Sequence, residues 1–211
     1  LRMRDMLRGG QMKYELKEHL GRGRFGIVYK AIDPRTSGKM AVKIVDRSAL
    51  LKDEVEILYH AQHENIVSYL CCDVKDDRTL IFMELCEGGS LNLSSLFTEP
   101  INWKEGPSLD RWEAIQRCLK QLLNAVAYLH DKNIAHRDIK PQNILLTGEN
   151  QVKLADFGVA HIIKVQQNTG GNSSPASAGN ATAKPAVEVQ GTCTYMAPEM
   201  LAGVTPANEM L

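Results

Sequence analysis

The chain has 211 residues, of which 44% are hydrophobic and 24% are charged, a composition typical of one large globular domain or two smaller lobes. Lysine plus arginine and aspartate plus glutamate each number 25, so the formal net charge is zero and no overall basic charge favours nucleic acid or a membrane surface as a partner. No apolar run approaches the ~20 residues needed to span a bilayer, and the first residues are charged where a signal peptide is apolar, so we expect a soluble protein in the cytoplasm or nucleus.

Three strands are predicted in the first part of the chain, over 14–20, 27–32 and 39–45. A glycine-rich turn separates the first two, and the turn signal DPRTSG separates the last two, so the strands should pair antiparallel. Within KMAVKIV at 39–45 the period of two puts Lys43 on the same face as Ala41 and Val45. Lys43 therefore lies among small and apolar neighbours and not among other charges.

A helix is predicted over 48–61, because Leu51, Val55 and Leu58 recur at helical spacing behind Ser48, a good N-cap residue. Two further strands follow, around NIVSYLCC and TLIFMEL, with the polar turn DVKDDR between them. The segment CEGGS then interrupts regular structure. We expect a first lobe to end there.

A second, helical lobe is predicted to begin at 111–130. This stretch carries an apolar stripe at helical spacing, formed by Ile115, Leu119, Leu122, Val126 and Leu129. NILLT and QVKLADFG then predict a short hairpin. The stretch 166–184 is rich in Gly, Ser, Asn and Ala and nearly free of bulky apolar residues, which is typical of a mobile loop.

The segment GRGRFGIV carries three glycines, Gly21, Gly23 and Gly26, between two predicted strands. Such a loop brings backbone N–H groups close to phosphate oxygens, with Phe25 at its tip, but a plain hairpin turn explains the glycines equally well. A strand follows the loop, whereas the dinucleotide-binding fingerprint requires a helix. For Lys43 alone, the alternative is a surface lysine whose stem lies along apolar surface.

The segment IAHRDIKPQNILL at 134–146 places charges between apolar residues that should be buried on both sides. A polar loop held between buried segments is a common location for catalytic residues. We therefore expect chemistry at this loop.

Together these segments resemble the eukaryotic protein kinase family. GRGRFGIV resembles its glycine loop, MAVK its strand lysine, HRDIKPQN its catalytic loop, KLADFGVA its magnesium loop and TYMAPE its A-P-E segment, in the family's order over 21–199. Lys140, two residues after Asp138, and GTCTYMAPE resemble the serine/threonine branch. HENIVSYL and LIFMELCEGGSL are similar to segments of kinases that phosphorylate other kinases.

The resemblance implies an α+β, bilobal fold: an antiparallel β-sheet lobe with one helix, followed by a mostly helical lobe. It divides the chain into an extension at 1–13, an ATP-binding lobe at 14–86 and a partial second lobe at 87–211, with an activation segment at 156–199. The family continues through further helices beyond this point, and the chain ends twelve residues after Glu199. We therefore expect a C-terminally truncated, incomplete second lobe.

The resemblance also implies catalytic and metal-binding roles. Asp138 orients a substrate hydroxyl and accepts its proton, and Lys140 neutralises the transferring phosphate. Asn143 and Asp156 supply oxygen ligands of the kind that Mg²⁺ prefers. Lys43 holds the α- and β-phosphates and is paired with a helix carboxylate, Glu54, with Glu56 as the alternative.

For the nucleotide, the resemblance implies contacts from the loop residues Gly21, Arg22, Gly23, Arg24, Phe25 and Gly26. Val28 and Ala41 form the roof of the adenine pocket and Leu145 its floor. Met83 is the gatekeeper, and the backbone of Glu84 and Cys86 hydrogen-bonds the adenine edge. For these apolar residues, core packing is the alternative interpretation.

Regulation is implied by Arg137, which would bind a phosphate on the activation segment. Thr194 is the first candidate for that modification, ahead of Ser173, Ser174, Ser177 and Thr182, whereas Thr192 should face Asp138 and Lys140. An upstream kinase is then a possible partner.

The sequence thus predicts an ATP- and Mg²⁺-dependent protein serine/threonine kinase in intracellular signalling, whose partners are ATP and a protein substrate and not nucleic acid or a membrane. The first alternative is a truncated kinase-like module that binds nucleotide or a partner without turnover. The second is a glycine-loop nucleotide-binding protein of another fold, which would require HRDIKPQN and ADFG to be accidental.

Overall fold

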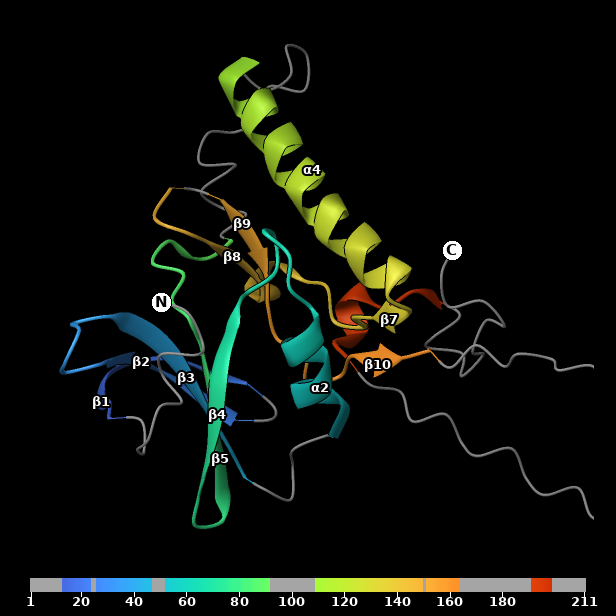
Figure 1. Ribbon diagram of the computed structural model, residues 1–211. Helices are drawn as coiled ribbons and strands as arrows, with labels where there is room; N and C mark the ends of the chain where they lie inside the picture. The colour runs from blue at the N-terminus through green and yellow to red at the C-terminus, as the bar shows by residue number, and fades with distance from the viewer. Residues whose placement is uncertain are drawn as a thin grey trace, which may run out of the picture.

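A computed structural model describes residues 13–23, 26–46, 52–91, 109–149, 151–163 and 191–198. Figure 1 shows a sheet on one side, a short helix beside it, and a long helix that extends away from both. The predicted N-cap Ser48 and the predicted mobile loop at 166–184 lie outside the described residues.

The sheet has five strands: β1 (Glu15–Gly23), β2 (Gly26–Ile32), β3 (Lys39–Asp46), β4 (Tyr69–Lys75) and β5 (Arg78–Glu84). Their order is β1-β2-β3-β5-β4 and every pairing is antiparallel, which confirms the predicted sheet. The strand predicted around NIVSYLCC begins only at Tyr69. Ile66 instead forms a parallel bridge with Leu154, and the Val67 N–H donates to the Leu154 carbonyl, so this segment pairs outside the sheet.

The two faces of β3 serve two different cores. Met40 and Val42 are buried on one face against Phe82, and Ile44 packs beside them. Val45 is buried on the opposite face with Ile81, in the core that also holds residues of the helices. The alternation predicted for KMAVKIV is therefore confirmed, and it directs Lys43 away from the outer core.

The short helix α2 (Lys52–His60) packs its apolar side chains Ile57 and Leu58 against the second face of the sheet. The same core contains Ile66, Leu129, Leu154 and Phe157, which come from segments far apart in the chain. The sheet and the helical part therefore share one hydrophobic core. Burial of this apolar area fixes how the two parts meet.

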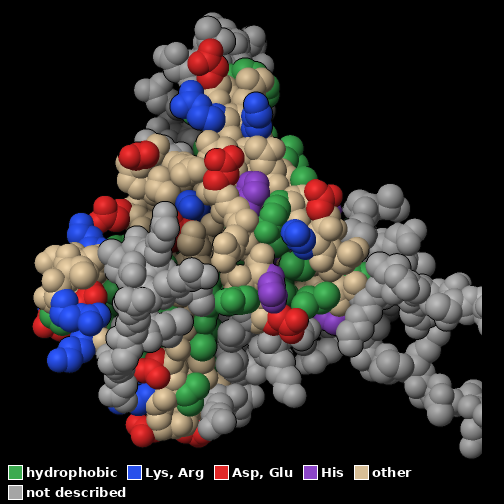
Figure 2. Space-filling view, viewed as in Figure 1, with side chains coloured by type: hydrophobic (Ala, Val, Ile, Leu, Met, Phe, Trp, Pro, Cys, Tyr) green, Lys and Arg blue, Asp and Glu red, His purple; other side chains and the backbone are tan. Residues whose placement is uncertain are grey.

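The long helix α4 (Leu109–Asp131) buries Ala125 and Leu129 near its C-terminal end, against β7 (Ile134–Ala135) and β9 (Val152–Leu154). The predicted apolar stripe is only partly buried, because Leu119 is 53% exposed. The nearby Leu123 is 64% exposed. The N-terminal half of α4 extends beyond the elements that cover its other half (Figure 1). Hydrophobic side chains accordingly show at the surface along this helix (Figure 2).

Short strands build the segment between the helices and the sheet. β8 (Ile144–Leu146) and β9 form the predicted hairpin, and β6 (Gly89–Ser90) joins β8, while β10 (His161–Ile162) pairs with β7. Two 3₁₀ turns complete the described elements, at Pro141–Asn143 and Cys193–Tyr195. Among the described residues, no helix has the length and apolarity needed to cross a bilayer.

Gly26 illustrates how tightly β2 and β3 approach each other. A Cβ at this position would overlap the Ile44 carbonyl and lie 3.2 Å from Val45 Cγ2. We expect Gly26→Ala to lower the free energy of unfolding by about 1–3 kcal/mol, because the backbone of β3 must shift. Urea unfolding measures the change. Gly21→Ala is the matched control, since a Cβ there meets nothing within 4 Å; equal losses in the two variants would contradict the steric explanation.

Candidate active site

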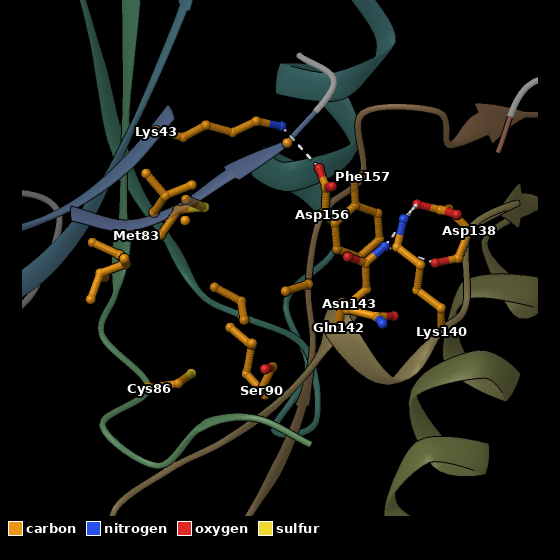
Figure 3. Close-up of a pocket in the computed structure, with 18 of the residues that line it drawn as sticks. Lys43, Met83, Cys86, Ser90, Asp138, Lys140, Gln142, Asn143, Asp156 and Phe157 are labelled. Carbon is orange, nitrogen blue, oxygen red and sulfur yellow. Dashed lines mark hydrogen bonds and ion pairs between the residues drawn. The ribbon is translucent and has the colours of Figure 1, made fainter. Parts of the chain in front are cut away.

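A cleft of ≈ 810 Å³ lies between the sheet and the hairpin β8–β9. Every described residue of the nucleotide-binding prediction lines it: Gly21, Arg22, Gly23, Gly26, Val28, Ala41, Lys43, Met83, Glu84, Cys86 and Leu145. Arg24 and Phe25 lie outside the described residues. Asp138, Lys140, Asn143 and Asp156 line the same cleft, so the structure brings two sets of predicted residues into one cavity (Figure 3).

Lys43 reaches across the cleft to Asp156. Its backbone lies opposite Val28 on β2 and Ile81 on β5, in the middle of the sheet. The Lys43 side chain is only 8% exposed, and its Nζ lies 3.0 Å from Asp156 Oδ1. Figure 3 shows the ammonium and the carboxylate pointing toward each other. The Lys43 side of this ion pair is shielded from water, whereas the Asp156 carboxylate is 34% exposed at the cleft.

The predicted carboxylate partner of Lys43 stays a prediction. Glu54 lies on α2, but its side chain is outside the described residues. Glu56, the alternative, is exposed to solvent on the same helix, whereas Lys43 is buried. The direct pair with Asp156 is a contact that sequence reasoning missed.

Asp138 is the centre of a hydrogen-bonded cluster. Its Oδ1 accepts from the Thr192 N–H at 3.0 Å and from the Thr192 hydroxyl at 2.6 Å. Its Oδ2 accepts from Lys140 Nζ at 2.6 Å and from Asn143 Nδ2 at 2.9 Å. Lys140 Nζ also donates to Thr192 Oγ1 at 2.6 Å, which confirms that Thr192 faces Asp138 and Lys140. Four donors hold this carboxylate in one orientation.

The protonation state of Asp138 follows from the same contacts. Burial raises the pKa of this carboxyl, but the hydrogen bonds from Lys140 and Thr192 lower it by more, so the pKa lies below its ordinary value of 3.8. The group is therefore ionised at neutral pH. An ionised carboxylate is a hydrogen-bond acceptor only, so it can accept a proton from a hydroxyl.

The His136 ring connects the segment that carries Asp138 to the segment that carries Ala155 and Asp156. Its Nε2 lies 3.1 Å from the Ala155 carbonyl, and its Nδ1 accepts from the Asp138 N–H at 3.3 Å, an arrangement that requires a neutral ring protonated on Nε2. The ring also meets the Phe157 ring edge-on, with centroids 4.9 Å apart. Burial lowers the pKa of His136, and the Ala155 carbonyl opposes that shift only in part.

This burial predicts a pH dependence of stability. The pKa of His136 in the folded chain lies below its ordinary value of 6.5, so the unfolded chain binds the proton more readily. The contribution to stability is complete above pH 6.5 and is lost as the pH falls below it. Urea unfolding between pH 8 and pH 5 should show a weaker pH dependence for His136→Gln than for the unchanged chain. Identical pH dependences would contradict this account.

Asn143 and Asp156 are chemically suited to hold Mg²⁺. Asn143 Nδ2 donates to the Asp138 carbonyl at 2.8 Å and to Asp138 Oδ2, which leaves the amide oxygen as the atom available to a cation. Asp156 supplies a carboxylate that is 34% exposed at the cleft. Its φ of 63° lies in the left-handed region, a conformation that is uncommon outside glycine and frequent at functional sites.

Several lining residues were not predicted from the sequence. The cleft also includes Leu20, Val67, Gln142, Phe157 and Val159. Leu20 directly precedes Gly21, and Phe157 directly follows Asp156, so adjacency to the motifs was a usable signal for these two. Val67 lines the cleft because its segment pairs with Leu154 and not with the five-stranded sheet. No local sequence pattern predicts that pairing.

The chain matches a family model described as "Protein kinase domain" over residues 14–210. It is 35% identical to the serine/threonine-protein kinase SSK22 of Saccharomyces cerevisiae, over 96% of this chain and 15% of that protein. It is 33% identical to the MAP kinase kinase kinase SSK2 of the same yeast, over 94% of this chain and 14% of that protein. The cytokinesis protein sepH of Emericella nidulans is 37% identical over 93% of this chain and 13% of its own length. The chain thus spans roughly one seventh of each of these relatives.

Proposed function

This chain belongs to the protein kinase family, and from that membership and the cleft we propose that it transfers the γ-phosphoryl group of Mg-ATP to serine or threonine hydroxyls of a protein. The observation that carries the proposal is the Asp138 carboxylate, which four hydrogen bonds hold in the same cleft as the Lys43–Asp156 pair. A carboxylate that accepts the hydroxyl proton and a cation that binds phosphate are two of the groups that position and stabilise this reaction.

In the proposed reaction Asp138 orients the substrate hydroxyl and accepts its proton as the oxygen bonds to the γ-phosphorus. The bond from that phosphorus to the bridging oxygen breaks, and ADP leaves with the electron pair. Lys140, whose Nζ is already held beside Asp138 at 2.6 Å, stabilises the charge on the transferring group. This contact keeps the cation in place before the substrate arrives.

The nucleotide is proposed to lie beneath β2 and β3, with Val28 and Ala41 above the base and Leu145 below it. The Glu84 N–H donates to the Ser68 carbonyl at 3.0 Å, so the Glu84 carbonyl and the Cys86 N–H are the groups proposed to bind the adenine edge. Lys43 would bind the phosphates. Magnesium, held by Asn143 and Asp156, would neutralise phosphate charge during transfer.

The substrate class and setting are part of the same proposal. Similarity to a MAP kinase kinase kinase supports another protein kinase as the acceptor protein in an intracellular signalling cascade. Thr194, which is exposed and lines the cleft, is the proposed site of modification by an upstream kinase, with Arg137 as its phosphate partner.

The test incubates the full chain with Mg-ATP labelled at the γ-phosphate and a protein rich in serine and threonine. Phosphoamino acid analysis then identifies the labelled residue. Thermal melts with and without Mg-ATP run in parallel, because a ligand that binds only the folded state raises the melting temperature. Label on serine or threonine supports the proposal. A folded chain that gains stability with Mg-ATP but transfers no phosphate would favour the nucleotide-binding module instead.

A further inference from the structure

A partly buried ion pair, which has no part in the proposed phosphate binding, connects the proposed adenine edge of the cleft to its floor. Lys153 Nζ lies 2.8 Å from Glu84 Oε1, and the same oxygen accepts from the Ser68 N–H at 2.6 Å. The Glu84 N–H in turn donates to the Ser68 carbonyl at 3.0 Å. We call these three residues, Glu84, Lys153 and Ser68, the Glu84 latch.

Lys153 is an unusual residue for its position. All three residues of β9 are buried, and the Lys153 side chain is only 9% exposed. A buried ammonium is costly unless a counter-charge accompanies it, and Glu84, 27% exposed, supplies that charge. Neither side chain has a part in the proposed proton transfer or in phosphate binding. The pair therefore requires another explanation.

The location of the pair supplies that explanation. Glu84 ends β5, between Met83 and Cys86, where the backbone is proposed to bind adenine. Lys153 lies opposite Leu145 in the hairpin, and Leu145 is the proposed floor of the adenine pocket. Lys153 also precedes the proposed magnesium ligand Asp156 by three residues. The latch thus spans from the edge of the pocket to the strand that carries its floor.

The third member of the latch is itself fixed to β9. The segment before Ser68 is held by the Val67 N–H to the Leu154 carbonyl at 2.9 Å and by the Leu154 N–H to the Asn65 carbonyl at 2.8 Å. Asn65 Nδ2 donates to the Val152 carbonyl at 3.0 Å. Ser68 is therefore a rigid anchor, and the Glu84 carboxylate is held from two sides.

We propose that Lys153 and the Glu84 carboxylate are positioning residues for the nucleotide: their ion pair fixes the distance between the adenine-binding backbone and the floor of the pocket. This inference rests on the proposed function, since it presumes that the cleft binds ATP. Preorganised binding groups lose less entropy when the ligand binds, so breaking the pair weakens nucleotide affinity more than it slows phosphate transfer.

The test measures the dissociation constant of a non-hydrolysable ATP analogue with Mg²⁺, together with KM for ATP and kcat, for the full chain. Lys153→Met removes the charge at similar length. We expect its dissociation constant and its KM to rise about 10-fold, with kcat within about 2-fold of the unchanged chain. Lys153→Arg, which restores a cation, should recover most of the affinity. Glu84→Gln keeps the acceptor for Ser68 and should weaken binding similarly.

The double variant decides whether the two residues act as a pair. Lys153→Met combined with Glu84→Gln should lose no more affinity than the worse single variant, because the second change removes an interaction already lost. Should Lys153→Met fail to melt cooperatively, Glu84→Gln with its milder change carries the same comparison. Additive losses in the double variant would overturn the proposal.

Lys39→Met is the matched control. Lys39 pairs with Glu87, three residues after Glu84, at 2.6 Å. Both side chains of this pair are about half exposed, at 52% and 51%. An exposed pair contributes little, so nucleotide affinity should stay within about 2-fold. Unchanged affinity in folded latch variants, or a rise in kcat with KM constant, would overturn the latch inference alone. Failure of the unchanged chain to bind the analogue would overturn the proposed function, and the latch inference with it.

Discussion

Asp138→Asn should abolish nearly all phosphate transfer, with kcat lower by about 10²–10⁴-fold, the range that general-base catalysis contributes. Asparagine has the same shape, and its amide oxygen can still accept the hydrogen bonds that Thr192 donates to Asp138. The change removes the negative charge, which accepts the proton of the hydroxyl, and places an NH2 group toward the donors Lys140 Nζ and Asn143 Nδ2. Because the hydrogen-bond partners of Asp138 do not include Lys43 or the residues proposed to bind adenine, the affinity for Mg-ATP should change much less than kcat.

Rapid quench or steady-state phosphate transfer measures kcat, and a thermal melt with Mg-ATP confirms that the variant is folded and binds nucleotide. Asp131→Asn is the control, because Asp131 is exposed at the end of α4. A folded Asp138→Asn variant that retains more than about a tenth of the activity would remove Asp138 from its proposed role.

Local periodicity predicted the elements of this fold because each one obeys its own pattern. The alternation in KMAVKIV predicted that Lys43 shares a face of β3 with Ala41 and Val45, and the structure confirms that this face is separate from the one that Met40 and Val42 bury. Turn signals likewise predicted the antiparallel order of β1, β2 and β3. These patterns depend only on residues close together in the sequence. They therefore predict burial correctly where neighbouring residues determine it.

Predictions failed where contacts with a segment distant in the sequence determine burial or strand pairing. Leu119 belongs to the apolar stripe of α4 by spacing, yet it is exposed because β7 and β9 cover only the other half of the helix among the described residues. The strand predicted from NIVSYLCC loses its first residues to a bridge with Leu154, nearly ninety positions away. Helical or alternating spacing carries no information on such partners.

The site shows the same division. The resemblance to the kinase family predicted that Thr192 would face Asp138 and Lys140, and their hydrogen bonds confirm that arrangement. The Glu84–Lys153 pair was missed, although its signal resembles the one that singled out Lys43. Lys153 stands between Val152 and Leu154 in a short apolar strand, as Lys43 stands among Ala41 and Val45. A lysine in a buried strand requires a partner, but the sequence does not identify which carboxylate supplies it.

Lys43→Met should lower kcat/KM for ATP by about 10²–10³-fold, the cost of removing one preorganised electrostatic group from a site. Methionine fills nearly the same volume beside Ala41 and opposite Ile81, so the sheet should tolerate the change. The variant leaves Asp156 without the ammonium that lies 3.0 Å from it, and that carboxylate becomes free to repel the phosphates. Both effects act against a bound nucleotide, one by loss of attraction and one by added repulsion.

Adding Asp156→Asn to this variant separates the two effects. If repulsion from Asp156 contributes, the double variant should bind a Mg²⁺-free ADP probe more tightly than Lys43→Met alone, since one negative charge has been removed near the phosphates. Calorimetric titration measures that affinity without requiring turnover. Lys30→Met on the neighbouring strand is the control, because Lys30 Nζ lies 3.8 Å from Glu18 and does not line the cleft. Full activity in Lys43→Met would show that the phosphates are bound elsewhere in the cleft, and equal ADP affinity in the single and double variants would show that Asp156 acts on the phosphates only through its metal.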